Sequence, residues 1–335
     1  MEIGSNCDNE AQIPILHFPK EIVGLLEQGR SSSICSSNSE KWKGMSGKMR
    51  EACENYGCFI LKCEEIPMIM STSALREQMF MASKALFDLP EETKQKHTSS
   101  KPYRSYTGNC PVIPLSESFG IDVNGSSFDT VTAFTNLMWP QGNKGFCESV
   151  SYMGKKMLEL CFIILRMMLE SLGMEKHYDS HVESTSSVLR LMKYRVGPAN
   201  GDSAQLGLVA HTDKSALTIL CQNEVQGLEL LTKQGTWLQL KIPEASFVVF
   251  VGDALKAWSN GRLHAATHRV IMKGDKERYS CGLFLVPKEE ATIEVPQELI
   301  DKEHPLLYRP FKFSDYFSYF VSNTSDDALE IYAGL

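Results

Sequence analysis

The sequence predicts an α+β fold in which a double-stranded β-helix, the jelly-roll arrangement, is flanked by helices that come mostly from the N-terminal half. From residue 188 on, short apolar runs follow one another, separated by turn-forming glycines such as Gly227, Gly235 and Gly252. Evenly spaced short strands of this kind are typical of an antiparallel sandwich or barrel. The predicted strands are 188–193, 206–210, 216–221, 228–231, 237–242, 247–251, 268–272 and 281–286.

The N-terminal part predicts helices with a few strands between them. Apolar residues recur at helical spacing in two segments, and Gly57 and Pro90 mark where these helices end. A third apolar segment carries Glu159, Arg166 and Glu170, which indicates a buried helix with charged edges and not a membrane span. The predicted elements are a strand at 13–17, a helix at 41–56, a strand at 58–62, a helix at 73–89 and a helix within 157–172.

Two segments predict loops. The Ser-rich stretch 31–39 cannot bury much apolar surface and is expected to be mobile. The stretch 101–143 carries Pro, Gly and Asn at short intervals and is expected to form a long loop of the kind that covers binding sites. We therefore divide one compact unit into an N-terminal region (1–112), a loop and long helix (113–185), a jelly-roll core (186–290) and a C-terminal helical segment (291–335).

Composition and charge exclude several classes of function. The chain has 335 residues, 43% hydrophobic and 22% charged, with a formal net charge of −7. This acidic balance offers no basic surface for nucleic acid or anionic membranes. The ten cysteines show no Cys-x-x-Cys pair and the N-terminus shows no export signal, so we expect reduced thiols in a cytoplasmic protein that acts as a monomer.

His211 and Asp213 form the first part of a candidate metal site. They stand two residues apart at the end of a predicted strand, so their side chains project to the same side. His268 begins another predicted strand and supplies a third ligand. Two imidazoles and one carboxylate leave open positions on a metal, which is typical of non-haem Fe(II) sites that activate O2. His264 competes for the third position, but it lies in a turn region and we prefer His268.

Arg278 and Ser280 form a candidate carboxylate clamp. They too stand two residues apart on a predicted strand, so they share a face. A guanidinium binds a carboxylate through two hydrogen bonds, and a neighbouring hydroxyl adds a third. An ordinary exposed arginine is the simpler interpretation of this pair alone; its place after the strand of His268 favours the clamp.

Taken together, these motifs resemble the plant 2-oxoglutarate-dependent dioxygenase family over nearly the whole chain. The most similar members are the clade of the glucosinolate side-chain dioxygenases and steroidal-alkaloid hydroxylases. The Asn, the first Tyr and the Pro of the family's Asn-Tyr-Tyr-Pro segment are absent here, where the chain reads Met-Lys-Tyr-Arg at 192–195. The resemblance rests on residues 211–220, 227–230, 252–253, 259–262, 267–270 and 278–280, with 86–94 and 13–15 upstream.

The resemblance implies iron held by His211, Asp213 and His268. It also implies 2-oxoglutarate held by Arg278, Ser280 and the Tyr194 hydroxyl, with ascorbate as a reductant. Oxidative decarboxylation would give succinate, CO2 and a ferryl oxidant that attacks a C–H bond of a small plant specialised metabolite. Hydroxylation is the expected outcome, with dealkylation, desaturation and ring closure as alternatives.

Substrate contacts and competing functions stay open at the level of sequence. Phe284 shares the alternation of Ser280 and is expected to point into the barrel, although core packing explains it equally well. Phe119 and Tyr103, in the predicted loop, are candidate substrate contacts or simple surface anchors. Two other functions compete: an oxidase on the same scaffold that does not use 2-oxoglutarate, and a jelly-roll binding protein without activity.

Overall fold

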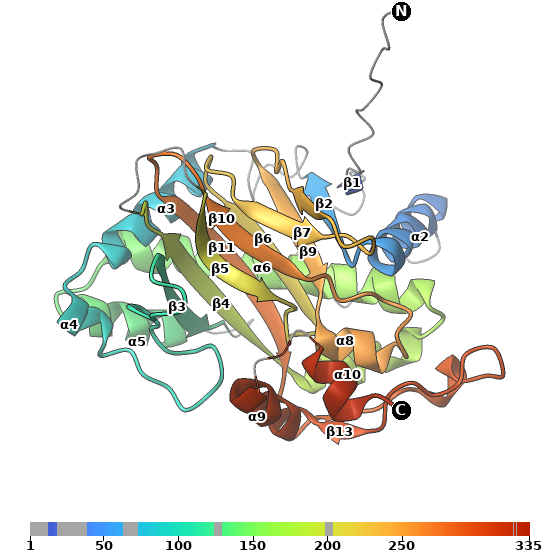
Figure 1. Ribbon diagram of the computed structural model, residues 1–335. Helices are drawn as coiled ribbons and strands as arrows, with labels where there is room; N and C mark the ends of the chain where they lie inside the picture. Colours follow the sequence, from blue (N-terminus) through green and yellow to red (C-terminus); the bar gives the residue numbers. More distant parts are fainter. Residues whose placement is uncertain are drawn as a thin grey trace, which may run out of the picture.

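The computed structural model describes residues 13–18, 39–62, 73–123, 129–197, 204–323, 325 and 327–335. In these residues, two β-sheets face each other and helices cover the outer face of the larger sheet (Figure 1). The larger sheet has the order β1 (Ile15–His17), β2 (Cys58–Lys62), β9 (Ser246–Val251), β6 (Leu217–Gln222), β11 (Arg278–Pro287), β4 (Thr185–Tyr194) and β3 (Ser116–Asp122). The smaller sheet has the order β5 (Gln205–His211), β10 (His268–Met272), β7 (Leu228–Leu231) and β8 (Trp237–Gln239).

This arrangement confirms the predicted jelly roll. Each of the eight apolar runs from residue 188 on overlaps one strand, and the pairings among these strands are antiparallel. Only β1 and β2 pair in parallel among the described strands. Side chains of both sheets, such as Met192 and Val270, meet in one core cluster between the sheets. This space between the sheets is called the barrel interior below.

Successive side chains on each strand of the larger sheet point alternately toward the helices and toward the barrel interior. In β11 the side chains of Leu283 and Leu285 join the core under the helices, whereas Phe284 belongs to a cluster on the opposite face. In β4, Leu189 and Leu191 likewise lie on the helix side. Strands that bury both faces read as nearly continuous apolar runs, which is why these segments were visible in the sequence.

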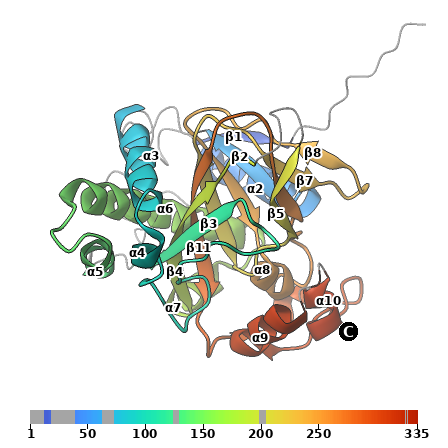
Figure 2. The same ribbon diagram turned by 60° about the vertical axis from the view of Figure 1, so that its left-hand side comes forward.

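Four helices cover the outer face of the larger sheet. The central one is α6 (Lys144–Ser171), which packs against β6 and β11 and against the other three helices (Figures 1 and 2). Asn143 caps its first turn by accepting a hydrogen bond from the Phe146 N–H. The other three are α2 (Glu40–Asn55), α3 (Ser73–Phe87) and α5 (Asp129–Met138).

The predicted loop 101–143 was wrong in part, because it contains β3 and α5. The inward face of β3 carries Ser116, Ser118 and Gly120, and only Phe119 and Ile121 face the helix-side core. A strand with so few apolar residues gives little signal in a sequence. The predicted loop 31–39 lies outside the described residues, except Ser39, which caps α2.

The C-terminal part closes one end of the barrel. It contains α9 (Phe313–Asn323), α10 (Ala328–Ala333) and a short hairpin of β12 (Thr292–Ile293) and β13 (Phe311–Lys312), and it lies beside α8 (Asp253–Trp258) (Figure 1). The short helices α4 (Glu91–Lys94) and α7 (Tyr178–Glu183) lie in connections. Nowhere in the described part of the chain does a helix have the length and apolar character needed to cross a membrane.

Candidate active site

The three predicted metal ligands meet at one point. His211 ends β5 and His268 begins β10, and these two residues are direct partners in the antiparallel pairing. Asp213 follows in the loop that leads to β6. Ligand atoms of the three residues all lie within 4.8 Å of one another, with His211 Nε2 3.8 Å from Asp213 Oδ1. Sheet pairing has therefore brought His268 beside the His-x-Asp pair, although the four strands β6 to β9 lie between β5 and β10 in the sequence.

The chemistry of the three side chains fits a divalent metal ion. His211 Nδ1 lies 2.8 Å from the Val209 carbonyl oxygen, and His268 Nδ1 lies 3.0 Å from that of Ala266. A ring nitrogen that faces a carbonyl carries the proton, which leaves the lone pair on Nε2 free to bind a metal. Burial, together with the neighbouring His268, lowers the pKa of His211 and keeps its ring neutral.

The carboxylate of Asp213 supplies the third donor. Its Oδ2 is buried and has no hydrogen-bond partner among the described residues. A buried carboxylate oxygen without a donor is unfavourable unless a cation or water satisfies it. Two imidazole nitrogens and one carboxylate oxygen are the donor set that Fe(II) oxygenases use, with positions left open for other ligands.

Helix α8 holds the loop that carries Asp213. The Asp253 N–H donates to the Asp213 carbonyl oxygen over 2.7 Å. Gly252 makes this approach possible, because a Cβ there would lie 2.1 Å from the Ser215 carbonyl oxygen. The buried side chain of Lys214 donates to Asp253 Oδ2 over 2.6 Å, and the Tyr316 hydroxyl of α9 donates to the same oxygen. The turn and helix start at 252–253 therefore hold the loop of Asp213 in place.

His264, the competing histidine, does not join the metal cluster. The backbone N–H of His264 donates to the Cys53 carbonyl oxygen, and His264 lines a separate cavity of about 870 Å³ beside β7 and β8. Burial is the main cause that lowers the pKa of His264 to about 4. The preference for His268 over His264 thus agrees with the geometry.

Arg278, Ser280 and Tyr194 lie together in the barrel interior. Arg278 is fully buried, its Nη1 lies 3.3 Å from Ser280 Oγ, and its guanidinium lies 5.0 Å from the centre of the Tyr194 ring. No described acidic residue pairs with Arg278. A fully buried guanidinium without an acidic partner is unfavourable unless an anion satisfies it, so this pocket suits a carboxylate.

Gln222 belongs to this pocket and was missed from the sequence. Its Oε1 accepts hydrogen bonds from Arg278 Nη2 at 2.8 Å and from Nε at 3.3 Å. Gln222 stands opposite Ser280 in the pairing of β6 with β11. A predicted strand pairing could have identified Gln222, because this polar residue directly follows the apolar run 216–221 and shares the inward face of Ser280.

The three predicted substrate contacts separate into two groups. Phe284 lies on the inward face of β11, and its ring stacks on that of Tyr103 with 6.4 Å between the ring centres. Phe119 is fully buried on the other face of the sheet, where it packs against Phe87 and Phe134. The prediction for Phe119 is therefore wrong: it is a core residue of β3, and strand alternation turns it away from the barrel interior.

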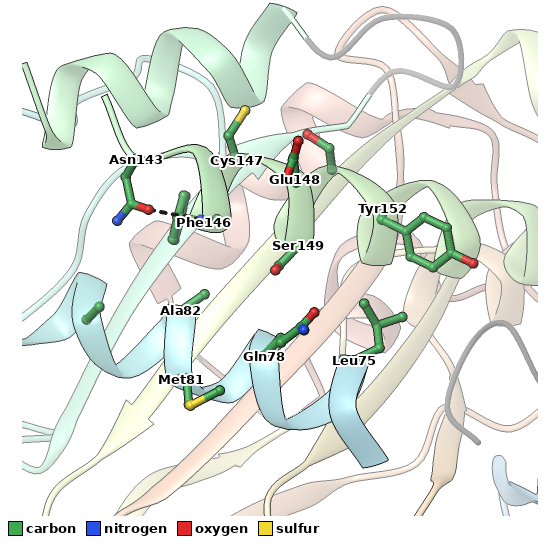
Figure 3. Close-up of a pocket in the computed structure, with 13 residues that line it drawn as sticks. Leu75, Gln78, Met81, Ala82, Asn143, Phe146, Cys147, Glu148, Ser149 and Tyr152 are labelled. Carbon is green, nitrogen blue, oxygen red and sulfur yellow. Dashed lines mark hydrogen bonds between the residues drawn. The ribbon is translucent and has the colours of Figure 1, made fainter. Parts of the chain in front are cut away.

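A further cavity lies outside the barrel. It has a volume of about 890 Å³ and lies between α3 and the first turns of α6, where Leu75, Met81, Phe146 and Tyr152 contribute to its lining (Figure 3). These helices cover the outer face of the larger sheet, so the cavity is separate from the site of His211.

The fold and this site together define a mononuclear non-haem iron oxygenase that uses a carboxylate cosubstrate. Comparison with known proteins agrees. Residues 185–287 match the model of the 2OG-Fe(II) oxygenase superfamily, and residues 31–135 match the model described as non-haem dioxygenase in morphine synthesis N-terminal. The chain belongs to the 2-oxoglutarate/Fe(II)-dependent oxygenase family.

Curated relatives cover most of the chain. The probable 2-oxoglutarate-dependent dioxygenase AOP1.2 of Arabidopsis thaliana is 38% identical over 317 residues, which cover 93% of this chain and 94% of that protein. The 2-oxoglutarate-dependent dioxygenase AOP3 of the same plant is 30% identical, over 87% of this chain and 92% of that protein.

Solved structures show the same architecture. The dioxygenase for auxin oxidation from rice has a TM-score of 0.76 and 30% identity, and the match covers 96% of this chain and all of that one. The corresponding Arabidopsis thaliana enzyme, solved with 2-oxoglutarate, has a TM-score of 0.73 and 27% identity, over 88% of this chain and all of that one. The protein is thus an oxidoreductase of the class that uses iron and 2-oxoglutarate.

Proposed function

We propose that this protein is an active Fe(II)- and 2-oxoglutarate-dependent dioxygenase that hydroxylates a small plant specialised metabolite. The observation that carries the proposal is the convergence of His211, Asp213 and His268 in one barrel. The same barrel holds the buried guanidinium of Arg278, which has no acidic partner among the described residues. The Arabidopsis relatives named as 2-oxoglutarate-dependent dioxygenases support the reaction class, and the resemblance to the clade of the glucosinolate side-chain dioxygenases supports the class of substrate.

Each side chain has a separate role in this proposal. His211 and His268 bind the iron through Nε2, and Asp213 binds it through its carboxylate. Arg278 and Ser280 hold the distal carboxylate of 2-oxoglutarate, and the Tyr194 hydroxyl adds a hydrogen bond. In the structure that hydroxyl faces the Met192 sulfur at 3.8 Å, a weak contact that an oxoacid could readily replace.

When bound, the iron supplies the O2 chemistry that couples decarboxylation of 2-oxoglutarate to C–H oxidation. The protein orients the reactants and excludes water. Phe250 supports this, since its ring stacks on His268 with 4.4 Å between ring centres and fixes the plane of the imidazole. Asp213 acts as a metal ligand in this proposal.

Succinate formation tests the proposed function. Purified protein with Fe(II), ascorbate and 2-oxoglutarate is screened against a library of plant metabolites, and succinate is measured first. We expect one compound class to stimulate succinate formation. Its product should have gained one oxygen atom, or should have lost an alkyl group or two hydrogen atoms. Substrate oxidation that proceeds equally without 2-oxoglutarate would favour the oxidase, and no succinate under any condition would favour the binding protein.

We also propose that the enzyme acts in the cytoplasm as a monomer. All seven cysteines among the described residues are free, as is usual in a reducing compartment. The iron and 2-oxoglutarate residues all come from a single chain, so the site is complete without a second copy. Gel filtration and a tagged protein in plant cells would test these two points.

A further inference from the structure

Arg190 is a second positively charged side chain in the barrel interior. It stands on β4 between the inward-facing residues Val188 and Met192, and strand alternation turns it to the same face. It pairs with Gly282 of β11 on one side and with Gly120 of β3 on the other. Arg190 and its two cross-strand partners therefore form one row across the sheet. The adjacent row contains the cross-strand partners Ser280 and Met192.

Two glycines allow other groups to approach Arg190 closely. A Cβ at Gly120 would lie 1.7 Å from the Tyr103 carbonyl oxygen, and a Cβ at Gly282 would lie 3.0 Å from the Phe284 ring. Tyr103 itself adopts a positive φ of 63°, a backbone conformation that is uncommon for a residue other than glycine. The segment of Tyr103 and the ring of Phe284 thus lie against the sheet on either side of Arg190.

The guanidinium of Arg190 is held in place but has no counter-charge among the residues that the structure describes. Its Nη2 donates to Ser118 Oγ over 2.8 Å, and its carbon lies 5.4 Å from the centre of the Tyr103 ring and 5.8 Å from that of Phe284. Its Nε is buried and has no hydrogen-bond partner, and no described acidic residue forms an ion pair with it. Two aromatic faces and one hydroxyl orient the guanidinium without neutralising it.

The position of Arg190 relative to the metal site suits substrate binding. Phe250, which stacks on His268, shares one cross-strand row with Thr218, Phe284 and Val188, and Arg190 stands in the adjacent row. Three strand spacings separate Phe250 from the strand of Arg190, which is about 14 Å along the sheet. The Tyr103 ring stacks on that of Phe284, which belongs to the row of Phe250, and its centre also lies 5.4 Å from the guanidinium carbon of Arg190.

We infer that Arg190 binds an oxoanion of the substrate, so that the substrate is an aromatic or aliphatic compound with a carboxylate or sulfate group. This inference rests on the proposed function and names the substrate class of the same site. Arg278 already serves the distal carboxylate of 2-oxoglutarate, so Arg190 is left for a second anion. The guanidinium presents its N–H groups in planar forks, each of which matches two oxygens of one oxoanion. Phe284 and Tyr103 then pack beside the apolar part of the substrate.

Matched ligands test this inference. Protein loaded with Fe(II) and 2-oxoglutarate without O2 is titrated by calorimetry with phenylacetate, 3-phenylpropanoate and indole-3-acetate, with the methyl ester of each acid and with phenyl sulfate. We expect the oxoanions to bind at least about 10-fold more tightly than the esters, because a charge-assisted hydrogen bond to a poorly solvated guanidinium is lost in the ester. Preference between the acids and phenyl sulfate identifies which oxoanion the site takes.

Variants show whether Arg190 causes the preference. In Arg190→Gln the ratio of ester to oxoanion dissociation constants is expected to fall about 10- to 100-fold, and Arg190→Lys is expected to keep part of it. The control is Arg195→Gln, just beyond β4, since Arg195 already contacts Glu117 and the Pro114 carbonyl. It removes the same charge and should leave the ratio unchanged.

Three results would overturn the inference. They are equal binding of oxoanions and esters by the wild type, an unchanged ratio in Arg190→Gln, and no saturable binding of any oxoanion in the series. The first and third need no variant, so a failure of Arg190→Gln to fold does not protect the inference. The proposed function is tested separately, by the visible absorption that Fe(II) and 2-oxoglutarate produce together before any ligand is added.

Discussion

Replacing Asp253 by asparagine tests how the C-terminal part of the chain supports the metal site. Lys214 and Asp253 form a buried ion pair whose side chains are 2% and 4% exposed, with 2.6 Å between Nζ and Oδ2. Asp253→Asn leaves the ammonium of Lys214 buried without a counter-charge. It keeps an amide oxygen for Tyr316 and for Lys214. The Asp253 N–H bond to the Asp213 carbonyl is unchanged, since it belongs to the backbone.

The structure sets the size of the expected effect. Removing one partner of a buried ion pair destabilises a fold by about 3 to 5 kcal/mol. Lys214 keeps a hydrogen bond to Thr212 Oγ1 at 2.8 Å and a contact with the Phe320 ring at 4.3 Å, so we expect the lower end, about 3 kcal/mol. Because the pair adjoins Asp213, the affinity for Fe(II) should fall as well.

Urea unfolding of the metal-free protein measures this effect. The control is Lys144→Met, which breaks the pair of Lys144 with Glu148, whose side chains are 87% and 67% exposed. That exposed pair should contribute less than about 1 kcal/mol. If Asp253→Asn changed the free energy of unfolding by no more than the control, the buried pair would not support the loop of Asp213, and this reasoning would be refuted.

Three further predictions concern single residues. Arg278→Lys keeps the charge but loses the fork, so the KM for 2-oxoglutarate should rise at least about 10-fold in steady-state assays, and more in Arg278→Gln; an unchanged KM would contradict the clamp. Gly252→Ala should push the loop of Asp213 away, with weaker Fe(II) binding and a loss of about 1 to 3 kcal/mol in stability, whereas Gly47→Ala, with nothing within 4 Å of the added Cβ, should not destabilise the fold. Burial, and then His177, lower the pKa of His181 to about 4 from its ordinary 6.5, so the unfolded chain takes up a proton at higher pH than the folded one. Stability should therefore fall as the pH falls from about 6.5 to about 4, less steeply in His181→Gln, and a pH profile of Tm that is equal in the two proteins would show otherwise.

Four strands of the larger sheet, β4, β6, β9 and β11, were predictable because they bury both faces along most of their length. Runs such as 247–251 are apolar at every position, and the structure places each of them in a sheet. His211 and Asp213 were predictable from the period of two, and His268 from its place at the start of an apolar run. Pairing of β5 with β10 then brings His268 opposite His211, a contact that only the register determines.

The residues that were missed or misplaced depend on long-range pairing. Phe119 was assigned to a loop because β3 is polar on its inward face, and without the strand there was no alternation to show that it points outward. Gln222 and Arg190 are ordinary polar residues in the sequence. Gln222 pairs with Ser280, and Arg190 pairs with the two glycines, so only the register of the sheet shows that both side chains face the barrel interior.

Absorption of the protein with Fe(II) and 2-oxoglutarate, in the absence of O2, tests the central claim most directly. Iron bound by two imidazoles and a carboxylate, with 2-oxoglutarate on its open side, should give a visible charge-transfer band in the wild type. We expect His211→Ala, Asp213→Ala and His268→Ala each to abolish the band, and His264→Ala to keep it. A band that survived in Asp213→Ala, or disappeared in His264→Ala alone, would contradict the assigned ligands.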